Sequence, residues 1–324
     1  MLDICVVGFG ALGSFYSFAL EKSGQTQVTA VCRSNYEVIK DHGLNIDSNV
    51  LGKHEAWRPY RVAASTQEAA DRPYRFVICS FKALPDVTST PDILGPLLNH
   101  ADAFVLIQNG VGVERELRRR LPTATIISGC SWADATIVEN GRLLTQYGLE
   151  HVTLGTHPLP DGEPEEGSVK LLTDLLLKGG TKPEPESDIV AQRWRKVLWN
   201  AAYSGLCTTS RATMGELLAP PNLELVNGTI RGIFDEIILI ARTSGIHTGT
   251  LLEDEAVGII RRTKPSDFKP SMLVDLEANR PIEVEVIFGE IVRKAAEVGV
   301  PAPRLQALYT TLKVIQHKIL AKRK

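Results

Sequence analysis

The chain has 324 residues, of which 44% are hydrophobic and 23% charged, and its formal net charge is −2. This is the composition of an ordinary globular protein, and at roughly 100–200 residues per domain its length predicts two domains. A charge so close to balance argues against nucleic acid or an anionic membrane surface as the binding partner.

The cysteines and histidines indicate neither a disulfide framework nor a metal site. No C-x-x-C pair occurs, and Cys5, Cys32 and Cys79 lie in apolar runs where a thiol acts as a small hydrophobic group. The histidines are scattered without metal-ligand spacing, so no metal is expected. The early apolar run lacks a basic start, and no stretch of about 18 apolar residues occurs. We therefore expect a cytoplasmic protein without membrane contact.

The first half of the chain alternates strand-like and helix-like segments. Helical patterns are expected over Ala11–Ser23, Val113–Leu121 and Ser168–Lys178, and Asn140-Gly141 predicts a hairpin turn. Short apolar strands alternating with helices predict an α/β fold, with a Rossmann-type, doubly wound and mostly parallel sheet. The strand candidates are Leu2–Val7, Val28–Arg33, Arg61–Ala64, Phe76–Ser80, Ala103–Ile107 and Thr125–Gly129.

The second half of the chain is almost wholly helical in pattern. Asp188 is a good N-cap, and glycine or proline residues separate the segments that follow. We therefore place the domain boundary there, with a sheet domain over 1–187 and an all-helical domain over 188–324. The helix candidates are 189–205, 222–244, 250–263, 270–280, 282–298 and 304–322.

A glycine-rich segment follows the first predicted strand and opens the first predicted helix. In its G-x-G-x-x-G pattern, Gly8 permits a tight turn, Gly10 lets a pyrophosphate approach the backbone, and Gly13 lets the helix pack closely on the strand. The free N–H groups of the helix start then face the phosphates. A purely structural glycine turn is the alternative, but strand, helix and second strand have the spacing of a dinucleotide-binding unit. The predicted cofactor contacts are Gly8, Phe9, Gly10, Ala11, Leu12 and Gly13.

The type of dinucleotide is predicted from the end of the second strand. Sites that prefer NAD place Asp or Glu there, about 20 residues after the glycines, to bind the ribose 2′-hydroxyl. This chain has Arg33 followed by Ser34 and Asn35, and no acidic residue lies between Glu21 and Glu37. Since a guanidinium beside hydroxyl and amide groups suits a 2′-phosphate, we expect NADP(H). The alternative is an ordinary surface arginine.

Polar residues also stand at two other strand ends and in the helical half. Lys82 and Asn109 follow predicted strands at the edge where open α/β sheets bind ligands, although both residue types are common in ordinary loops. Lys196, Asn200 and Ser204 recur at every fourth position, so a helix places them roughly in one row. A solvated stripe is the alternative for that row, but the segment also carries two tryptophans and a tyrosine.

This ordered set of motifs resembles the ketopantoate reductase family, in the superfamily of 6-phosphogluconate-dehydrogenase-like oxidoreductases. The helical half is similar to fungal members of the family. The resemblance covers nearly the whole chain and rests on the order of the motifs, since each motif alone is common. The motifs are Gly8–Gly13, Lys82, Asn109-Gly110, the W-R-K-x-x-x-N block at 194–200, Ser271–Asp275, and Arg280-x-x-Glu283 with Gly289 six residues later.

The resemblance implies a role for each matching residue. Lys196 matches the catalytic lysine and Glu283 the active-site glutamate, while Asn200 and Ser271 match substrate-binding positions. On the cofactor side, the matching positions are Asn109 at the nicotinamide end, Lys82 near the cofactor and the cleft, and Ala135.

The chain departs from the bacterial pattern of the family in the expected substrate pocket. Ser204 stands at the position of a substrate-binding asparagine, and Met214 at that of a second one. Ser204 remains a candidate substrate contact through its hydroxyl. These two changes bear on which substrate is bound and leave the hydride chemistry untouched.

The implied function is NADPH-dependent reduction of a 2-keto acid to a 2-hydroxy acid. Ketopantoate or a close analogue is the expected substrate, with Lys196 as the general acid. One alternative is an NADPH-binding regulator without turnover, motivated by Ser204 and Met214. Another is an opine- or imine-forming dehydrogenase, which would need an amine co-substrate. The expected partner is a small molecule, and a homodimer is compatible with the helical second domain.

Overall fold

The computed structural model describes residues 1–159, 166–246 and 251–323, so the helix candidate over 250–263 begins at a residue outside them. The chain forms two compact units. We call residues 1–83, 88–108 and 113–189 the sheet unit, and residues 84–87, 109–112 and 190–324 the helical unit. Two short loops from the first half of the sequence thus belong with the helical unit. The assignment of separate roles to 1–187 and 188–324 remains a prediction.

One mixed sheet is the centre of the sheet unit. In the described residues it has ten strands in the order β4-β3-β9-β8-β7-β6-β1-β2-β5, and β10 pairs with β9. Neighbouring strands from β8 to β5 in this order are all parallel, which confirms the predicted Rossmann-type fold class. The strands are β1 (Leu2–Val7), β2 (Thr26–Val31), β3 (Leu44–Ser48), β4 (Gly52–Trp57), β5 (Arg61–Ala63), β6 (Tyr74–Cys79), β7 (Ala101–Leu106), β8 (Thr125–Val138), β9 (Leu143–Thr156) and β10 (Pro183–Pro185).

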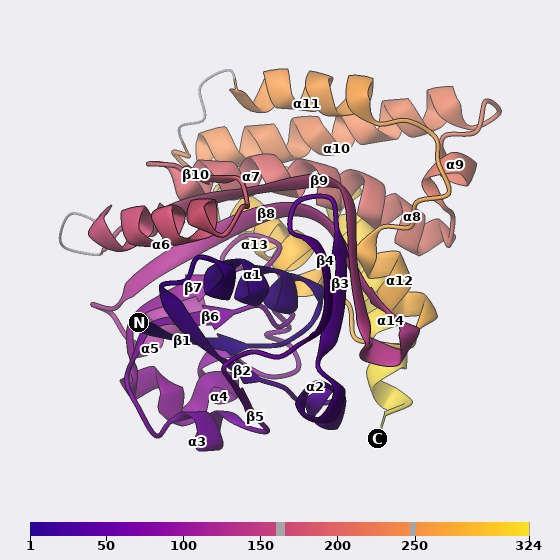
Figure 1. The fold of residues 1–324 in the computed structure, drawn as a ribbon. Coiled ribbons are helices and arrows are strands. Elements are labelled where there is room, and N and C mark those ends of the chain that lie inside the picture. The colour runs from indigo at the N-terminus through magenta and orange to yellow at the C-terminus, as the bar shows by residue number, and fades with distance from the viewer. Residues whose placement is uncertain (160–165, 247–250, 324) are drawn as a thin grey trace. The chain divides into compact units, whose positions relative to one another are not determined.

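Helices cover this sheet. Figure 1 shows α1 near α6, and these two helices pack on each other. Helix α1 also packs on β8 and β9, and α6 packs on β9. Apolar side chains of α1, β1 and β6 contribute to the core, with Phe15, Ile4 and Phe76 completely buried. The helical segments of this unit are α1 (Ala11–Lys22), α2 (Tyr36–His42), α3 (Thr66–Ala69), α4 (Thr90–Leu94), η1 (Gly95–Asn99), α5 (Arg115–Arg120), η2 (Glu139–Gly141) and α6 (Glu166–Lys178).

The antiparallel part of the sheet is larger than the sequence predicts. The strand predicted over Thr125–Gly129 continues to Val138, because its buried start is followed by residues of alternating exposure that pair with β9. The predicted turn at Asn140-Gly141 does join these two strands. The hairpin of β3 and β4 was not predicted, since β4 is polar and mostly exposed.

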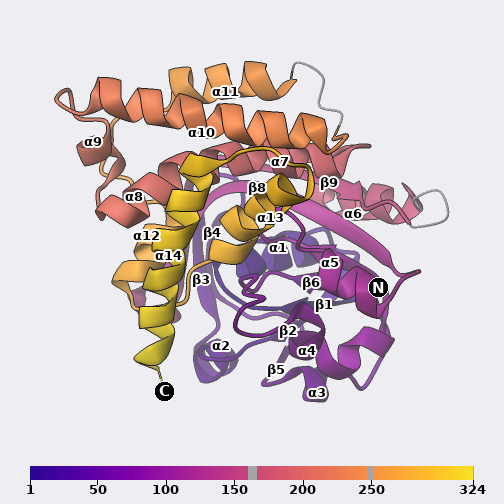
Figure 2. The ribbon, with the colours of Figure 1, turned by 180° about the vertical axis from the view of Figure 1, so that it is seen from behind.

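The helical unit confirms the predicted all-helical second half. Figure 2 shows α13 and α14 side by side, and the two helices pack on each other. In α14, Leu305, Leu312 and Ile319 are buried at a spacing of seven residues, which gives the helix one apolar face. The helices of this unit are α7 (Ile189–Trp199), η3 (Asn200–Ser204), α8 (Gly205–Ser210), α9 (Met214–Leu217), α10 (Leu223–Thr243), α11 (Leu251–Arg262), α12 (Ser271–Glu277), η4 (Glu285–Gly289), α13 (Glu290–Glu297) and α14 (Pro303–Ala321).

All five cysteines are buried and free of disulfides. Burial raises the pKa of Cys5 and of Cys32 to about 12. Within the described ranges, no group of His, Cys, Asp and Glu has the arrangement of a metal site, and no helix is long and apolar enough to cross a membrane.

Candidate active site

The three glycines of the glycine-rich turn differ in the space around them. Gly8 has a φ of +94°, and a Cβ there would lie 2.5 Å from the backbone nitrogen of Phe81. A Cβ at Gly13 would collide with the carbonyl oxygen of Gly8. At Gly10, by contrast, an added Cβ would meet no atom of the described residues within 4 Å. Packing therefore explains Gly8 and Gly13, while Gly10 borders open space at the start of α1, as close approach of a phosphate would require.

Neighbouring strands hold this turn in place. The side-chain amide of Asn35, just after β2, donates to the Phe9 carbonyl at 2.8 Å. Ser80, just after β6, donates from Oγ to the Gly8 carbonyl at 2.5 Å. The ring of Phe9 itself is buried and stacks on Trp57, with centroids 6.1 Å apart. The Phe9 side chain therefore belongs to the core, and its predicted cofactor contact concerns the backbone alone.

The other predicted cofactor residues of the sheet unit come from different parts of the sheet. Arg33 is exposed, two residues beyond β2, and Lys82 is partly buried, three residues beyond β6. Both strands are parallel neighbours of β1, so their carboxyl ends share an edge with the glycine-rich turn. Ala135 lies in the antiparallel part of β8, beyond a register shift, and is packed against the core.

In the helical unit, the structure brings together three predicted residues that are distant in sequence. Lys196 donates from Nζ to Oδ1 of Asn109 at 3.0 Å, and Asn109 donates from Nδ2 to Oε2 of Glu283 at 3.2 Å. An ammonium only donates and a carboxylate only accepts, so both ends of the Asn109 amide are oriented by charge. Glu283 is 7% exposed. The result is a cation, an amide and an anion joined in one row.

Backbone contacts fix the position of Asn109 in this row. The next residue, Gly110, has a φ of +88°, and a Cβ there would collide with the carbonyl of Val286 in η4. Val111 N–H donates to that same carbonyl at 2.8 Å, and Arg193 of α7 donates from Nη1 to the Gly110 carbonyl at 2.9 Å. The loop after β7 is thereby tied to the two helical segments that bear Lys196 and Glu283.

Two π-helical turns, η3 and η4, stand next to these residues and pack on each other. In an α-helix, each step of four residues overshoots a full turn by about 40°, so Ser204 would drift away from Lys196. A π turn takes more residues per turn, and η3 therefore returns Ser204 toward the helix face that carries Lys196 and Asn200. Ser204 is 2% exposed, and its Oγ has no hydrogen-bond partner among the described residues. Buried hydroxyls are usually hydrogen-bonded, so this Oγ remains a candidate contact for a ligand.

The remaining substrate-side predictions differ in how the structure places them. Asn200 is partly buried at the first position of η3, and Ser271 is exposed as the first residue of α12, which packs on η3. Met214 is 2% exposed, and its sulfur lies 3.7 Å from that of Cys207. Met214 therefore packs within the helical unit, and no polar group replaces the expected asparagine there.

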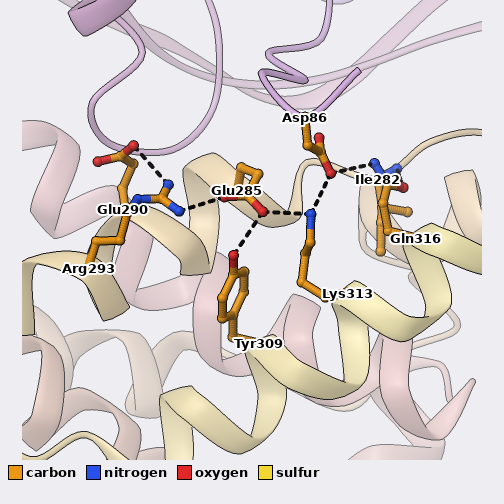
Figure 3. Close-up of polar contacts among 8 residues, drawn as sticks. All are labelled: Asp86, Ile282, Glu285, Glu290, Arg293, Tyr309, Lys313 and Gln316. Carbon is orange, nitrogen blue, oxygen red and sulfur yellow. Dashed lines mark hydrogen bonds and ion pairs between the residues drawn. The ribbon is translucent and has the colours of Figure 1, made fainter. Parts of the chain in front are cut away.

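A second polar network in the helical unit was missed by the sequence analysis. Glu285 accepts hydrogen bonds from Lys313 at 2.8 Å, Arg293 at 2.8 Å and Tyr309 at 2.9 Å, as Figure 3 shows. Burial alone would raise the pKa of Glu285, but these three donors outweigh it and leave the pKa below its ordinary value. The available signal was the spacing of Tyr309, Lys313 and Gln316, which places them on one face of a helix.

Comparison with known proteins identifies the family. Residues 4–158 match the family model described as Ketopantoate reductase PanE/ApbA, and residues 188–316 match the model of its C-terminal part. The crystal structure of 2-dehydropantoate 2-reductase from Methylococcus capsulatus is 30% identical in sequence and has a TM-score of 0.82, with 98% of each chain covered. The chain belongs to the ketopantoate reductase family. This finding confirms the resemblance inferred from the motifs.

A further relative and a further solved structure are similar to this chain over nearly its whole length. An uncharacterized protein of Saccharomyces cerevisiae is 29% identical over 347 residues, covering 98% of this chain and 95% of its own, so a fungal relative exists. The ternary structure of D-mandelate dehydrogenase with NADH and anilino(oxo)acetate has a TM-score of 0.84 and 22% identity, covering 98% of this chain and 99% of its own. At that identity the second match shows the fold alone.

Proposed function

We propose that this member of the ketopantoate reductase family reduces a 2-keto acid to a 2-hydroxy acid with NADPH. The observation that carries the proposal is the row in which Asn109 joins Lys196 to Glu283. Reduction of a carbonyl needs a hydride donor and a proton donor for the oxygen. The open edge at Gly10 fits the cofactor's pyrophosphate, and the row supplies the proton donor.

Lys196 is the general acid in this proposal. A nicotinamide cofactor, when bound, would supply the hydride for the carbonyl carbon. The Lys196 ammonium stabilises negative charge on the carbonyl oxygen and transfers a proton from Nζ to it, which leaves a neutral amine and a 2-hydroxy acid. Asn109 holds the ammonium in place by accepting a hydrogen bond from it, and it donates to Glu283, which orients that carboxylate to accept a hydrogen bond from the substrate hydroxyl.

The hydroxyl of Ser204 supports the proposal that this residue contacts the substrate. Its Oγ is buried and lacks a partner among the described residues, as expected for a group that bonds a ligand. The apolar packing of Met214 supports a pocket with one polar contact fewer than the bacterial pattern of the family implies. Ketopantoate or a close analogue is the proposed substrate, with Asn200 and Ser271 as further contacts.

The choice of NADPH over NADH rests on Arg33. This side chain is exposed near the carboxyl end of β2, where an NAD site would carry an acid. Lys82 adds a second cation at the same edge of the sheet. A cytoplasmic location and a homodimer belong to the same proposal.

The test is a panel of 2-keto acids, including ketopantoate and phenylglyoxylate, assayed with NADPH and with NADH. It is run on the wild type, on Lys196→Ala and on Lys318→Ala as a control on an exposed lysine. We expect NADPH oxidation with at least one acid, and kcat lower by about 10²–10⁴-fold in Lys196→Ala alone. Wild-type kcat in Lys196→Ala would contradict the catalytic assignment.

The same panel separates the alternatives. A protein that binds NADPH tightly and turns over no acid would be a regulator without turnover, for which the Lys196–Asn109–Glu283 row has no evident use. Turnover only when an amine is added would identify an opine- or imine-forming dehydrogenase.

A further inference from the structure

The segment that carries Glu283 is held by a side chain outside the proposed catalytic row. The backbone N–H of Ile282 donates to Oε1 of Gln316 in α14 at 2.9 Å. Ile282 is completely buried and Gln316 is 1% exposed, so water does not replace this hydrogen bond. Because an unpaired buried N–H is unfavourable, the Gln316 oxygen determines where the backbone just before Glu283 lies.

Asp86 determines which way the Gln316 amide points. Its Oδ2 lies 3.4 Å from Nε2 of Gln316 and 2.9 Å from Nζ of Lys313 (Figure 3). A carboxylate only accepts hydrogen bonds, so the NH₂ end of the amide faces Asp86 and the oxygen is turned toward Ile282. Lys313 forms an ion pair with Asp86 and so offsets its charge.

The chain just after Glu283 is also held by α14. Glu285 accepts from Lys313 and Tyr309 of α14, and Figure 3 shows both side chains reaching it from that helix. The residues on both sides of Glu283, at positions 282 and 285, are therefore anchored on one face of α14. This face carries polar side chains, whereas the neighbouring face of α14 packs in the core.

We propose that Gln316 is a positioning residue for the Glu283 carboxylate: by holding the Ile282 N–H, it sets Glu283 against the Asn109 amide. The inference rests on the proposed function, in which Glu283 belongs to the active site. A displacement of Glu283 by about 1 Å is enough to lower turnover by up to about 100-fold, because a catalytic group must meet the reacting atoms in one geometry.

The first test compares Gln316→Met with Gln306→Met, a matched change of an exposed glutamine in the same helix. Methionine has nearly the length of glutamine but cannot accept from Ile282. We expect kcat to fall about tenfold in Gln316→Met with the NADPH Kd unchanged, and neither to change in Gln306→Met. Gln316→Asn, one methylene shorter, is the second variant in case Gln316→Met does not fold.

A purely structural role of Gln316 is distinguished by combining the change with Glu283→Gln. If Gln316 acts through Glu283, Gln316→Met lowers kcat in the wild type but has no further effect in Glu283→Gln. An equal loss of kcat in both backgrounds would overturn the inference, as would an unchanged kcat in a folded Gln316→Met.

A measurement without turnover separates this inference from the proposed function. NMR of the whole chain follows hydrogen exchange of the Ile282 amide and the side-chain amide signals of Asn109, which report its contact with Glu283. We expect faster exchange and shifted Asn109 signals in Gln316→Met only. If no keto acid is reduced, the proposed function fails, yet unchanged signals would still reject the positioning role and altered signals would support it.

Discussion

Lys196 donates a hydrogen bond from Nζ to Oδ1 of Asn109 at 3.0 Å, although the two residues are 87 positions apart in the chain. The contact joins α7 to the loop that follows β7, and Asn109 in turn donates a hydrogen bond to Glu283. Asn109 was expected at the nicotinamide end of the cofactor. Its contacts give it a further proposed task, which is to hold the acid and the carboxylate in register.

Asn109→Ala tests that task. Removal of the amide takes away the acceptor of Lys196 and the donor to Glu283, so both side chains lose their shared partner. We expect kcat/KM for the 2-keto acid to fall by about 10–100-fold, because the general acid is no longer held in place. Asn99→Ala, at an exposed position, is the control. An unaltered kcat/KM in Asn109→Ala would show that the row is not needed for turnover.

The two outer glycines and the middle glycine of the turn should respond differently to alanine. In Gly13→Ala the new Cβ collides with the Gly8 carbonyl and would lie 2.5 Å from Oγ of Ser80, so we expect a lower Tm. In Gly10→Ala the Cβ meets nothing within 4 Å in the described residues, so we expect an unchanged Tm. The NADPH Kd should nevertheless rise at least tenfold, since the methyl group occupies the approach of the pyrophosphate.

Calorimetry with and without NADPH checks both variants. A Gly10→Ala protein that binds NADPH as tightly as the wild type would place the phosphates elsewhere.

Features that depend on neighbouring residues in the chain were predictable from the sequence. The glycine-rich segment from Gly8 to Gly13 follows β1 and runs into the start of α1 as expected, because a short apolar strand, the glycine spacing and a helical pattern stand next to one another. The helices α10 and α14 match their predicted ranges within a residue at each end, since stop signals and apolar periodicity agree there.

Features that depend on tertiary contacts were not predictable. The strand β4 carries lysine, histidine and glutamate and forms only because it pairs with β3. The π turns η3 and η4 have no local sequence signature, so Lys196, Asn200 and Ser204 were expected on one face of a regular helix. The role of Gln316 depends on Asp86, which is 230 positions away in the chain.

The buried thiols lead to a prediction about reactivity. Burial raises the pKa of Cys207, as it does for Cys5 and Cys32, to about 12 in each case. The reactive thiolate is therefore scarce near neutral pH, and access to the sulfur is blocked as well. We expect the native protein to react with a disulfide reagent far more slowly than the protein unfolded in guanidinium, which should yield all five thiols. Rapid modification of the native protein would contradict this burial.

Glu285 should make the stability of the protein depend on acid pH. Its folded-state pKa lies below the ordinary value of 4.5, because hydrogen bonds from Lys313, Arg293 and Tyr309 outweigh the effect of burial. A carboxyl whose pKa is lowered by folding stabilises the protein above its unfolded pKa, and this stabilisation is lost as pH falls from about 4.5 through the lower folded pKa. In Glu285→Gln we expect the free energy of unfolding at neutral pH to fall by about 1–3 kcal/mol, less than for a fully buried pair because Arg293 and Lys313 reach solvent.

Urea unfolding of wild type and Glu285→Gln across this pH range measures the difference. The two free energies should converge as the pH falls well below 4.5, because the wild-type carboxyl then becomes neutral like the amide. Other acidic groups titrate in both proteins and cancel in the comparison. Glu224→Gln, an exposed acid in the first turn of α10, serves as the control and should show a small difference at every pH. A gap between wild type and Glu285→Gln that stays constant with pH would mean that hydrogen bonding alone, and not the charge of Glu285, holds η4 on α14.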